Sequence, residues 1–281
     1  MERPEDEKIS GAKGERCRTI LSVFDPQHHN AESSLSIVVP TYNERDRLSD
    51  LVGATFDAFG RHGVRGELVV VDDNSPDGTG ELAEDLARRY PVRVIHRAGK
   101  LGLGTAVIEG FGVAASQVLG VMDADLSHPP SLLPAMLSIL NATSADLVVA
   151  SRYVPGGQTI GWPFSRLAMS RAACWLARPL TPVHDATSGF FLIRRDLVRD
   201  VQISAGGFKI CLELLVRSRP RLVVEVPYAF TNRTAGESKM NVREALGYLR
   251  QLVELGRFQL LGEGSRPVRQ QITISEIHSR S

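Results

Sequence analysis

Residues 35–44 read LSIVVPTYNE, a short β-branched apolar run that stops at a proline and continues in polar residues. By its length and composition, Leu35–Val39 is predicted to be a buried strand. Asn43 and Glu44 are then predicted to open a helix, whose apolar side chains recur at helical spacing: Leu48, Leu51, Val52 and Phe56. A strand followed directly by a helix is the repeating unit of an α/β fold.

The same unit repeats through the first half of the chain. Strands are predicted at 67–71, 92–96, 118–122 and 146–150, and helices at 81–89, 105–115 and 132–140. This order predicts a mainly parallel sheet flanked by helices. Ligands bind beyond the carboxyl ends of such strands. Three polar clusters follow strands and should therefore share one rim: Pro40–Glu44, Asp72–Asp77 and Asp123–Asp125.

The second half of the chain has a different pattern. We expect a helix or helical pair at 162–180, a strand at 189–194, short helices at 197–201 and 209–217, a strand at 223–230, and a long amphipathic helix at 241–261. Residues 34–261 are thus predicted to form one domain. The charged stretch 1–33 is predicted to be a disordered tail, and 262–281 a polar carboxy-terminal tail.

Composition excludes several classes of protein. The 281 residues are 43% apolar and carry a formal net charge of +1, without the basic excess typical of nucleic-acid binding. The three scattered cysteines, Cys17, Cys174 and Cys211, fit neither a disulfide framework nor a zinc site. The sequence shows neither a signal-peptide core nor a transmembrane run, so a cytoplasmic protein is expected, with any membrane contact peripheral.

Asp123 and Asp125 come directly after the predicted strand 118–122. Two carboxylates at this spacing can share one hard cation with the oxygens of a diphosphate; a solvated turn that caps a helix is the alternative. His128, shortly after them, is more typical of a loop residue than of a ligand. The glycine-rich stretch 99–104 lacks the residue order of a Walker loop, which favours a tight loop before a helix, although Lys100 can reach a phosphate from it.

Basic residues gather in two further places. Arg152 follows the predicted strand 146–150, and Arg166 and Ser170 lie four apart, on one helical face. Guanidinium and hydroxyl groups suit a phosphate monoester, and the surrounding apolar residues suit a lipid; an ordinary amphipathic helix is the alternative. Arg233 and Lys239 flank a glycine and a serine, either to clamp a diphosphate or as part of a solvated loop.

Together these stretches resemble the dolichol-phosphate mannose synthases and their bacterial polyprenol-phosphate relatives, within family 2 of the inverting glycosyltransferases. The resemblance spans residues 35 to about 255, and its motifs follow in order: VVPTYNE at 38–44, VVDDNSPDGT at 70–79, GLGTA at 102–106, MDADLSHPP at 122–130, SRY at 151–153, WPFSRLAMSR at 162–171, SGFF at 188–191 and FTNRTAGESKM at 230–240.

The resemblance implies a GT-A-type fold, a nucleotide-sugar donor and Mg²⁺ or Mn²⁺. By position, it places the nucleoside at Pro40, Tyr42 and Glu44, with Asp72 and Asp73; the metal at Asp123 and Asp125; the donor diphosphate at these acids, Ala124, Arg233 and Lys239; and the acceptor phosphate at Arg152, Arg166 and Ser170. Asp123, Asp125 and Arg233 would be the catalytic residues.

The expected reaction moves a hexose, mannose from GDP-mannose, onto a polyprenyl monophosphate at the cytosolic membrane face. Many relatives carry carboxy-terminal transmembrane segments that this chain lacks, which implies a peripheral enzyme that a separate small membrane protein can anchor. SGFF at 188–191 is closer to bacterial versions. Three alternatives stay open: a UDP-dependent glucosyl or aminosugar transferase, a sugar nucleotidyltransferase, and a non-enzymatic membrane adaptor.

Overall fold

A computed structural model describes residues 34–199, 201, 203, 209–231, 242–261 and 270–273 of the chain. Its centre is an eight-stranded sheet in the order β10-β8-β5-β7-β4-β1-β2-β3. The strands are β1 Ser34–Thr41, β2 Arg65–Asp72, β3 Val92–His96, β4 Val118–Val121, β5 Leu147–Ser151, β7 Phe191–Arg194, β8 Leu222–Pro227 and β10 Gln270–Thr273. In this sheet only β7 runs antiparallel to its neighbours, so the predicted mixed, mainly parallel sheet is confirmed.

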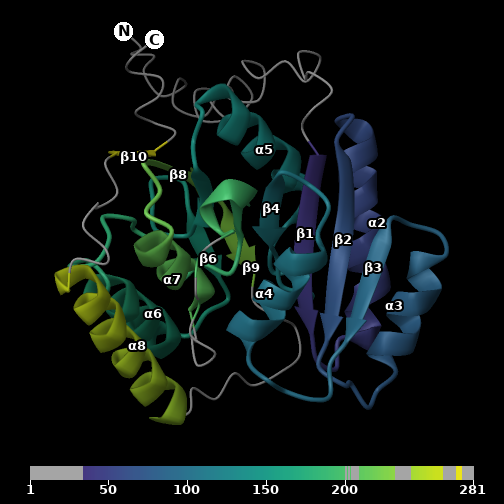
Figure 1. The fold of residues 1–281 in the computed structure, drawn as a ribbon, viewed down its shortest axis with the longest axis horizontal. Coiled ribbons are helices and arrows are strands. Elements are labelled where there is room, and N and C mark those ends of the chain that lie inside the picture. Colours follow the sequence, from purple (N-terminus) through teal and green to yellow (C-terminus); the bar gives the residue numbers. More distant parts are fainter. Residues whose placement is uncertain are drawn as a thin grey trace, which may run out of the picture.

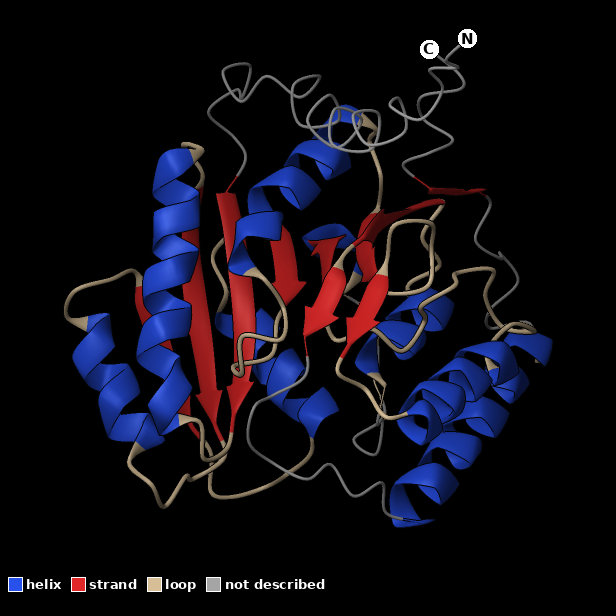
Figure 2. Cartoon of the chain, turned by 180° about the vertical axis from the view of Figure 1, so that it is seen from behind, coloured by secondary structure: helices blue, strands red, loops and turns tan. Residues whose placement is uncertain are grey.

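Helices cover both faces of the sheet (Figures 1 and 2). One face carries α2 Arg45–Arg61, α3 Thr79–Ala87 and α5 Leu133–Ala142, and the other carries α4 Leu103–Val113 and α7 Ile210–Arg217. Amphipathic spacing explains the docking of α2, since it buries a single stripe made of Leu48, Leu51, Val52, Thr55 and Phe59. Two hydrophobic cores result, one on each side of the sheet.

The register of β1 sets the position of the predicted polar rim. β1 lies between β4 and β2 and is parallel to both. Its arrowhead in Figure 1 points to the lower edge of the sheet, as does that of β2. The backbone amide of Asp73 donates to Thr41 O (3.0 Å) and that of Met122 donates to Val38 O (3.1 Å). The ends of β4, β1 and β2 therefore lie side by side, as the alternating pattern predicted.

The second half departs from the predicted elements in detail. The predicted strand 223–230 is two strands, β8 and β9 Ala229–Thr231, and β9 pairs with an unpredicted strand, β6 Gln158–Ile160. The break comes at Tyr228, whose amide donates to Ser151 O (3.2 Å) while its carbonyl accepts from Gln158 N (3.0 Å). Because β6 is short and mostly exposed, it has no apolar periodicity that could have identified it.

Several helices are shorter than expected or begin elsewhere. The predicted segment 162–180 contains α6 Phe164–Leu176, which starts after Pro163, and the helix expected at 197–201 is a 3₁₀ turn at Arg195–Leu197. The predicted helix 241–261 is α8 Val242–Leu260, which packs beside α6 through a hydrogen bond from Tyr248 Oη to Ala173 O (2.7 Å). None of the described helices is both long and apolar enough to cross a membrane.

The carboxy-terminal boundary needs a correction. Residues 262–281 were predicted to be a polar tail, yet Gln270–Thr273 form β10, parallel to Leu222–Glu225 at the edge of the sheet. A strand at the edge of a sheet has unpaired backbone N–H and C=O groups. Another strand can pair with these groups of β8 without any apolar side-chain pattern of its own. The predicted disordered stretch 1–33 lies outside the described residues.

Candidate active site

Asp72 braces the rim from within. It is buried, its Oδ1 accepts from Thr41 Oγ1 (3.0 Å) and Ser75 Oγ (2.5 Å), and its Oδ2 accepts from the amide of Ser75 (3.0 Å). The hydroxyl of Ser75 in turn accepts from the amide of Asn43 (3.0 Å). Asp72 therefore links the loop after β1 to the loop after β2. Because its side chain is buried, we expect Asp72 to act on a nucleoside by positioning these two loops.

The loop after β1 presents the other predicted nucleoside residues. Tyr42 is exposed, and the Nζ of Lys100 lies 3.3 Å from the centre of its ring. Pro40 is half-buried at the end of β1, and the amide of Glu44 donates to Thr79 Oγ1 (3.0 Å), fixing the start of α2 against the turn before α3. The glycine-rich loop thus brings Lys100 over Tyr42, a cation–π contact that spacing did not reveal.

Asp73 is paired with an arginine that the sequence analysis did not single out. Arg97 Nη1 donates to Asp73 Oδ1 (2.7 Å), and the Arg97 side chain is almost wholly buried. Burial raises the pKa of the Asp73 carboxyl, while Arg97 favours its charged form. Thr105 Oγ1 also accepts from Arg97 (2.5 Å), so the start of α4 is fixed to this pair.

The acidic pair lies after β4, at the same rim. The Asp123 side chain is 42% exposed, and Asp125 Oδ1 accepts from the amide (3.0 Å) and the hydroxyl (2.5 Å) of Ser127. Ala124 is buried in the core, so its predicted contact with a nucleotide sugar could be made only by its backbone. A Cβ at Gly189 would lie 3.4 and 3.5 Å from the two Asp123 oxygens. The glycine leaves room beside the carboxylate, which fits a metal bound by two acids and completed by phosphate.

His128 holds this acidic loop in place through a hydrogen bond to its backbone. Its Nδ1 accepts from the amide of Asp123 (3.1 Å), and its buried ring stacks on Phe190 at 5.1 Å. An Nδ1 that accepts is unprotonated, so the ring is neutral with its proton on Nε2. Burial lowers the pKa of His128, although Asp123 opposes that shift. His128 was expected to be a loop residue, and no sequence signal indicated that it supports Asp123.

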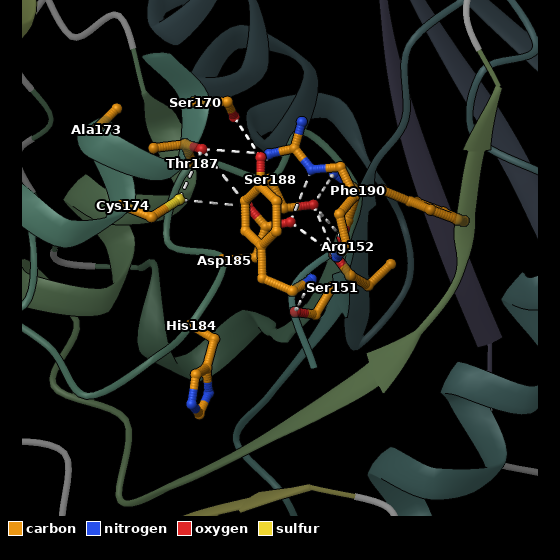
Figure 3. Close-up of polar contacts among 12 residues, drawn as sticks. Ser151, Arg152, Ser170, Ala173, Cys174, His184, Asp185, Thr187, Ser188 and Phe190 are labelled. Atoms are coloured by element: carbon orange, nitrogen blue, oxygen red, sulfur yellow. Dashed lines mark hydrogen bonds and ion pairs between the residues drawn. The ribbon is translucent and has the colours of Figure 1, made fainter. Parts of the chain in front are cut away.

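Arg152 is held by a buried carboxylate that the sequence did not point to. Its Nε and Nη2 donate to the two oxygens of Asp185 (2.8 and 2.7 Å), and Nη2 also donates to Thr187 Oγ1 (3.2 Å), as Figure 3 shows. Burial disfavours the charged guanidinium, but Asp185 outweighs it, and the pKa of Arg152 is raised. Nη1 makes no hydrogen bond to the described part of the chain.

The predicted acceptor residues converge around two aromatic rings. The guanidinium carbon of Arg166 lies 4.1 Å from the Trp162 ring centre and 5.9 Å from that of Phe230, and that of Arg152 lies 5.3 and 5.8 Å from the same rings. Ser170 Oγ accepts from Tyr153 Oη (2.7 Å). The fold therefore brings Arg152 and Arg166 to the same two rings. Ser170 is hydrogen-bonded to Tyr153, whose ring lies beside Arg152.

The acidic and basic clusters are joined by a continuous set of rings. Phe230 contacts His128 (5.7 Å between ring centres) as well as Trp162 (5.1 Å), so it lies between the support of Asp123 and the two arginines. Arg233 and Lys239, predicted to bind the donor diphosphate, follow Phe230 in sequence but lie outside the described residues. In the described site, Asp123 and the two arginines are thus linked through the rings of His128, Phe230 and Trp162.

Comparison with known proteins gives this site a context. The family model for "Glycosyl transferase family 2" matches residues 36–202. The chain is 41% identical over 239 residues to "Dolichol-phosphate mannosyltransferase" of Pyrococcus furiosus, covering 84% of this chain and 66% of that protein. It is 40% identical to "Polyprenol monophosphomannose synthase" of Mycolicibacterium smegmatis, covering 79% of this chain and 88% of that protein.

Solved structures show the same fold. Glucosyl-3-phosphoglycerate synthase from Mycobacterium tuberculosis, in complex with Mn²⁺, UDP-glucose and phosphoglyceric acid, matches 90% of this chain and 84% of its own with a TM-score of 0.57 at 19% identity. At 19% identity this similarity shows a common fold and nothing about function. It confirms the expected GT-A-type architecture.

Proposed function

Because this chain belongs to glycosyl transferase family 2, we propose that it moves mannose from GDP-mannose onto a polyprenyl monophosphate and inverts the anomeric centre. The observation that carries the proposal is the facing pair of clusters. Exposed Asp123 lies on one side of a shared set of aromatic rings, and the guanidinium groups of Arg152 and Arg166 lie on the other. One cluster suits a metal-bound diphosphate and the other suits a phosphate monoester.

On the donor side, we assign the nucleoside to the loop of Pro40, Tyr42 and Glu44, and Mg²⁺ or Mn²⁺ to Asp123 and Asp125. A bound divalent ion would neutralise charge on the departing diphosphate. Ser127 and His128 orient the acids before any ligand arrives. Arg233 and Lys239 would complete the diphosphate site.

On the acceptor side, Arg152 and Arg166 present the phosphate of the lipid to the sugar. The second pKa of a phosphate monoester is about 6, so its oxygen is already a nucleophile near neutral pH. That oxygen forms a bond to the anomeric carbon while the bond from this carbon to the diphosphate oxygen breaks and its electron pair leaves with GDP. No proton has to move, and the mechanism needs no general base from the protein.

We further propose that the enzyme works at the cytosolic surface of a membrane, through the paired helices α6 and α8. Both carry large apolar side chains in contact with solvent: Phe164 (83% exposed) and Trp175 on α6, and Leu246, Leu249, Val253 and Leu260 on α8. Exposed apolar groups gathered on neighbouring helices are typical of an interfacial site. Arg166 and Ser170 lie on α6 itself, so docking this helix would bring the lipid phosphate to the arginines. A separate small anchor protein would add to the same contact.

The decisive test uses the purified chain with GDP-mannose or UDP-glucose, Mn²⁺ and a polyprenyl phosphate. We expect mannolipid to form from GDP-mannose only, and Asp123→Asn to lower the rate at least about 100-fold, because a developing negative charge loses its stabilisation. Asp46→Asn, an exposed acid on the first turn of α2, is the matched control and should keep the parent rate.

Two results would contradict the proposal. Transfer of glucose in preference to mannose would remove the donor assignment. An Asp123→Asn enzyme with the parent rate and an unchanged melting temperature would remove the metal assignment. Calorimetry of GDP-mannose binding with and without Mn²⁺ separates loss of the donor from loss of the chemical step.

A further inference from the structure

A cationic hollow lies beside α6, next to the proposed acceptor residues but apart from the two clusters described above. It has a volume of about 270 Å³ and is lined by Tyr153, Arg171, Cys174, Trp175, Arg178 and His184. Arg171 and Trp175 lie four residues apart and so share one face of α6, and Arg178 lies in the turn that follows the helix. The space far exceeds the ~30 Å³ that one water molecule occupies in the liquid, so a headgroup phosphate fits.

The charges of this hollow are unbalanced. No carboxylate of the described residues comes within ion-pair distance of Arg171 or Arg178. Arg178 Nη1 donates to the carbonyl of Pro182, and Arg171 lies over the Tyr153 ring at 5.8 Å. Two acids near the lining have other partners: Asp185 binds Arg152, and Glu225 binds Nδ1 of the lining residue His184 (2.9 Å).

The thiol in the wall adds no negative charge. Burial raises the pKa of Cys174 to about 11, so it stays protonated at neutral pH. Its Sγ lies 3.3 Å from Thr187 Oγ1, within the polar cluster of Figure 3. Within the described residues, the hollow therefore presents two exposed arginines to which no carboxylate is paired.

The lining of the hollow also includes one large, exposed apolar ring. Trp175 is 72% exposed, and Leu176 beside it is also exposed. A phosphate ion in water would gain nothing from these side chains, whereas a phosphate that carries acyl chains would. Tryptophan is the residue that membrane interfaces favour, because its ring is amphipathic.

We propose that this hollow binds the headgroup phosphate of an anionic phospholipid, with Arg171 and Arg178 as the phosphate ligands and Trp175 among the acyl chains. The site is distinct from the acceptor site but shares a wall with it: the Tyr153 ring lines the hollow, and its hydroxyl donates to Ser170. A lipid bound here would fix α6 against the bilayer at the place where the acceptor phosphate must arrive. This role in positioning α6 for the acceptor rests on the proposed function, whereas the binding of the phospholipid does not.

The test is sedimentation of the whole chain with vesicles of phosphatidylcholine, alone or with phosphatidylglycerol added, in the absence of any sugar donor. Removing two basic residues near an anionic surface should weaken binding about 30-fold, so we expect that loss for Arg171→Gln/Arg178→Gln on the phosphatidylglycerol vesicles. Arg88→Gln/Arg89→Gln is the control, since it removes the same charge from exposed residues at the end of α3. Circular dichroism melting checks that both variants fold.

A second readout reports the position of the hollow directly. The chain has two tryptophans, so the difference in emission between the parent and Trp175→Phe gives the signal of Trp175. We expect that signal to shift to shorter wavelength with phosphatidylglycerol vesicles in the parent, and not in Arg171→Gln/Arg178→Gln.

Three outcomes would overturn the proposal. Equal losses in both double variants would mean that only diffuse charge attracts the bilayer. Unchanged binding of Arg171→Gln/Arg178→Gln would remove the site. Calorimetric binding of inorganic phosphate that the same variant loses, without any effect on vesicles, would assign the hollow to a soluble phosphate. Because no donor is present, failure of mannose transfer leaves all these results interpretable.

Discussion

At the scale of single residues, the site depends on buried groups that hold the exposed ones. Asp185, which is wholly buried, fixes two of the three guanidinium nitrogens of Arg152, so the orientation of Nη1 depends on this pair. His128 acts in the same way on Asp123, through the backbone amide. In the proposed mechanism, the chemistry would therefore depend on buried residues that do not themselves contact a substrate.

Asp185→Asn should destabilise the fold and lower transfer together. Removing one partner of a buried ion pair leaves an uncompensated charge, and we expect a loss of about 3 kcal/mol in the free energy of unfolding. Urea titration followed by circular dichroism measures it. Asp85→Asn is the control, because its pair with Arg88 is exposed and such pairs contribute about 0–1 kcal/mol. Equal stability of the two variants would show that the Arg152–Asp185 pair has no such role.

His128 should make stability depend on pH. Its pKa in the folded protein lies below the ordinary 6.5. As pH falls below about 6.5, His128 becomes protonated in the unfolded chain but stays neutral in the folded chain. The free energy of unfolding therefore decreases, by up to about 1.4 kcal/mol per pH unit.

We therefore expect the fall in unfolding free energy between pH 7 and pH 5.5 to be smaller in His128→Asn than in the parent. Parallel urea titrations at the two pH values measure the difference. His62→Asn, at the exposed end of α2, should keep the slope of the parent. The same slope in His128→Asn and the parent would exclude His128 as the titrating group.

At the scale of elements, the rim depends on how closely α4 approaches β1. α4 packs across β1 at Gly110, where an added Cβ would lie 2.5 and 2.7 Å from the two methyl carbons of Val38. Val38 is fully buried and sits in the strand that leads to Pro40 and Tyr42. A shift of α4 would therefore disturb both the end of β1 and the Thr105–Arg97 contact at the start of the helix.

Gly110→Ala should destabilise the protein by about 1–3 kcal/mol, because the extra methyl group overpacks the contact with Val38. Gly112→Ala on the same helix is the matched control, since no atom lies within 4 Å of its Cβ. Alanine there should stabilise the helix by up to about 1 kcal/mol. Thermal melting compares them, and Val38→Ala should restore part of the loss in Gly110→Ala. Two alanine variants of equal stability would show that α4 does not need the close approach.

At the scale of the whole molecule, the residues proposed for the donor and for the acceptor lie in different parts of the fold. The proposed donor loops lie at the ends of β1, β2 and β4, whereas two of the proposed acceptor residues, Arg166 and Ser170, lie on α6, which packs beside α8 at the periphery of the fold. The apolar side chains of α6 and α8 point into solvent there. A bilayer against these helices would deliver a lipid phosphate while the donor rim stays in contact with water.

Phe164→Glu/Leu246→Glu should therefore lower transfer to a long-chain polyprenyl phosphate in vesicles and leave transfer to a short, water-soluble analogue unchanged. Adding charge to exposed positions should leave the melting temperature near that of the parent. Val113→Glu, on an exposed position of α4, is the control. If both acceptors lose the same factor, the helices act in folding or catalysis and not in membrane contact.

Much of the fold could be predicted because its signals are local. The run 35–39, the alternation of strands and helices, and the acids at 123 and 125 are each visible in neighbouring residues, and they correctly predicted that the ends of β1, β2 and β4 lie at one edge of the sheet. The paired Arg166 and Ser170 could also be predicted, since helical spacing alone puts them on one face. The elements that were missed, β6 and β10, are short, and in β6 little apolar surface is buried, so they left no periodic pattern.

What the sequence by itself determined was the kind of sheet and which residue types stand at its rim, since strand order and side-chain periodicity are written in neighbouring positions. Only the tertiary structure decided the partners: Asp185 for Arg152, Arg97 for Asp73, and the His128 ring beneath Asp123. Buried charges and hydrogen bonds must be satisfied by whatever group the fold brings near. Those groups come from positions up to 33 residues away, and no local pattern records which they are.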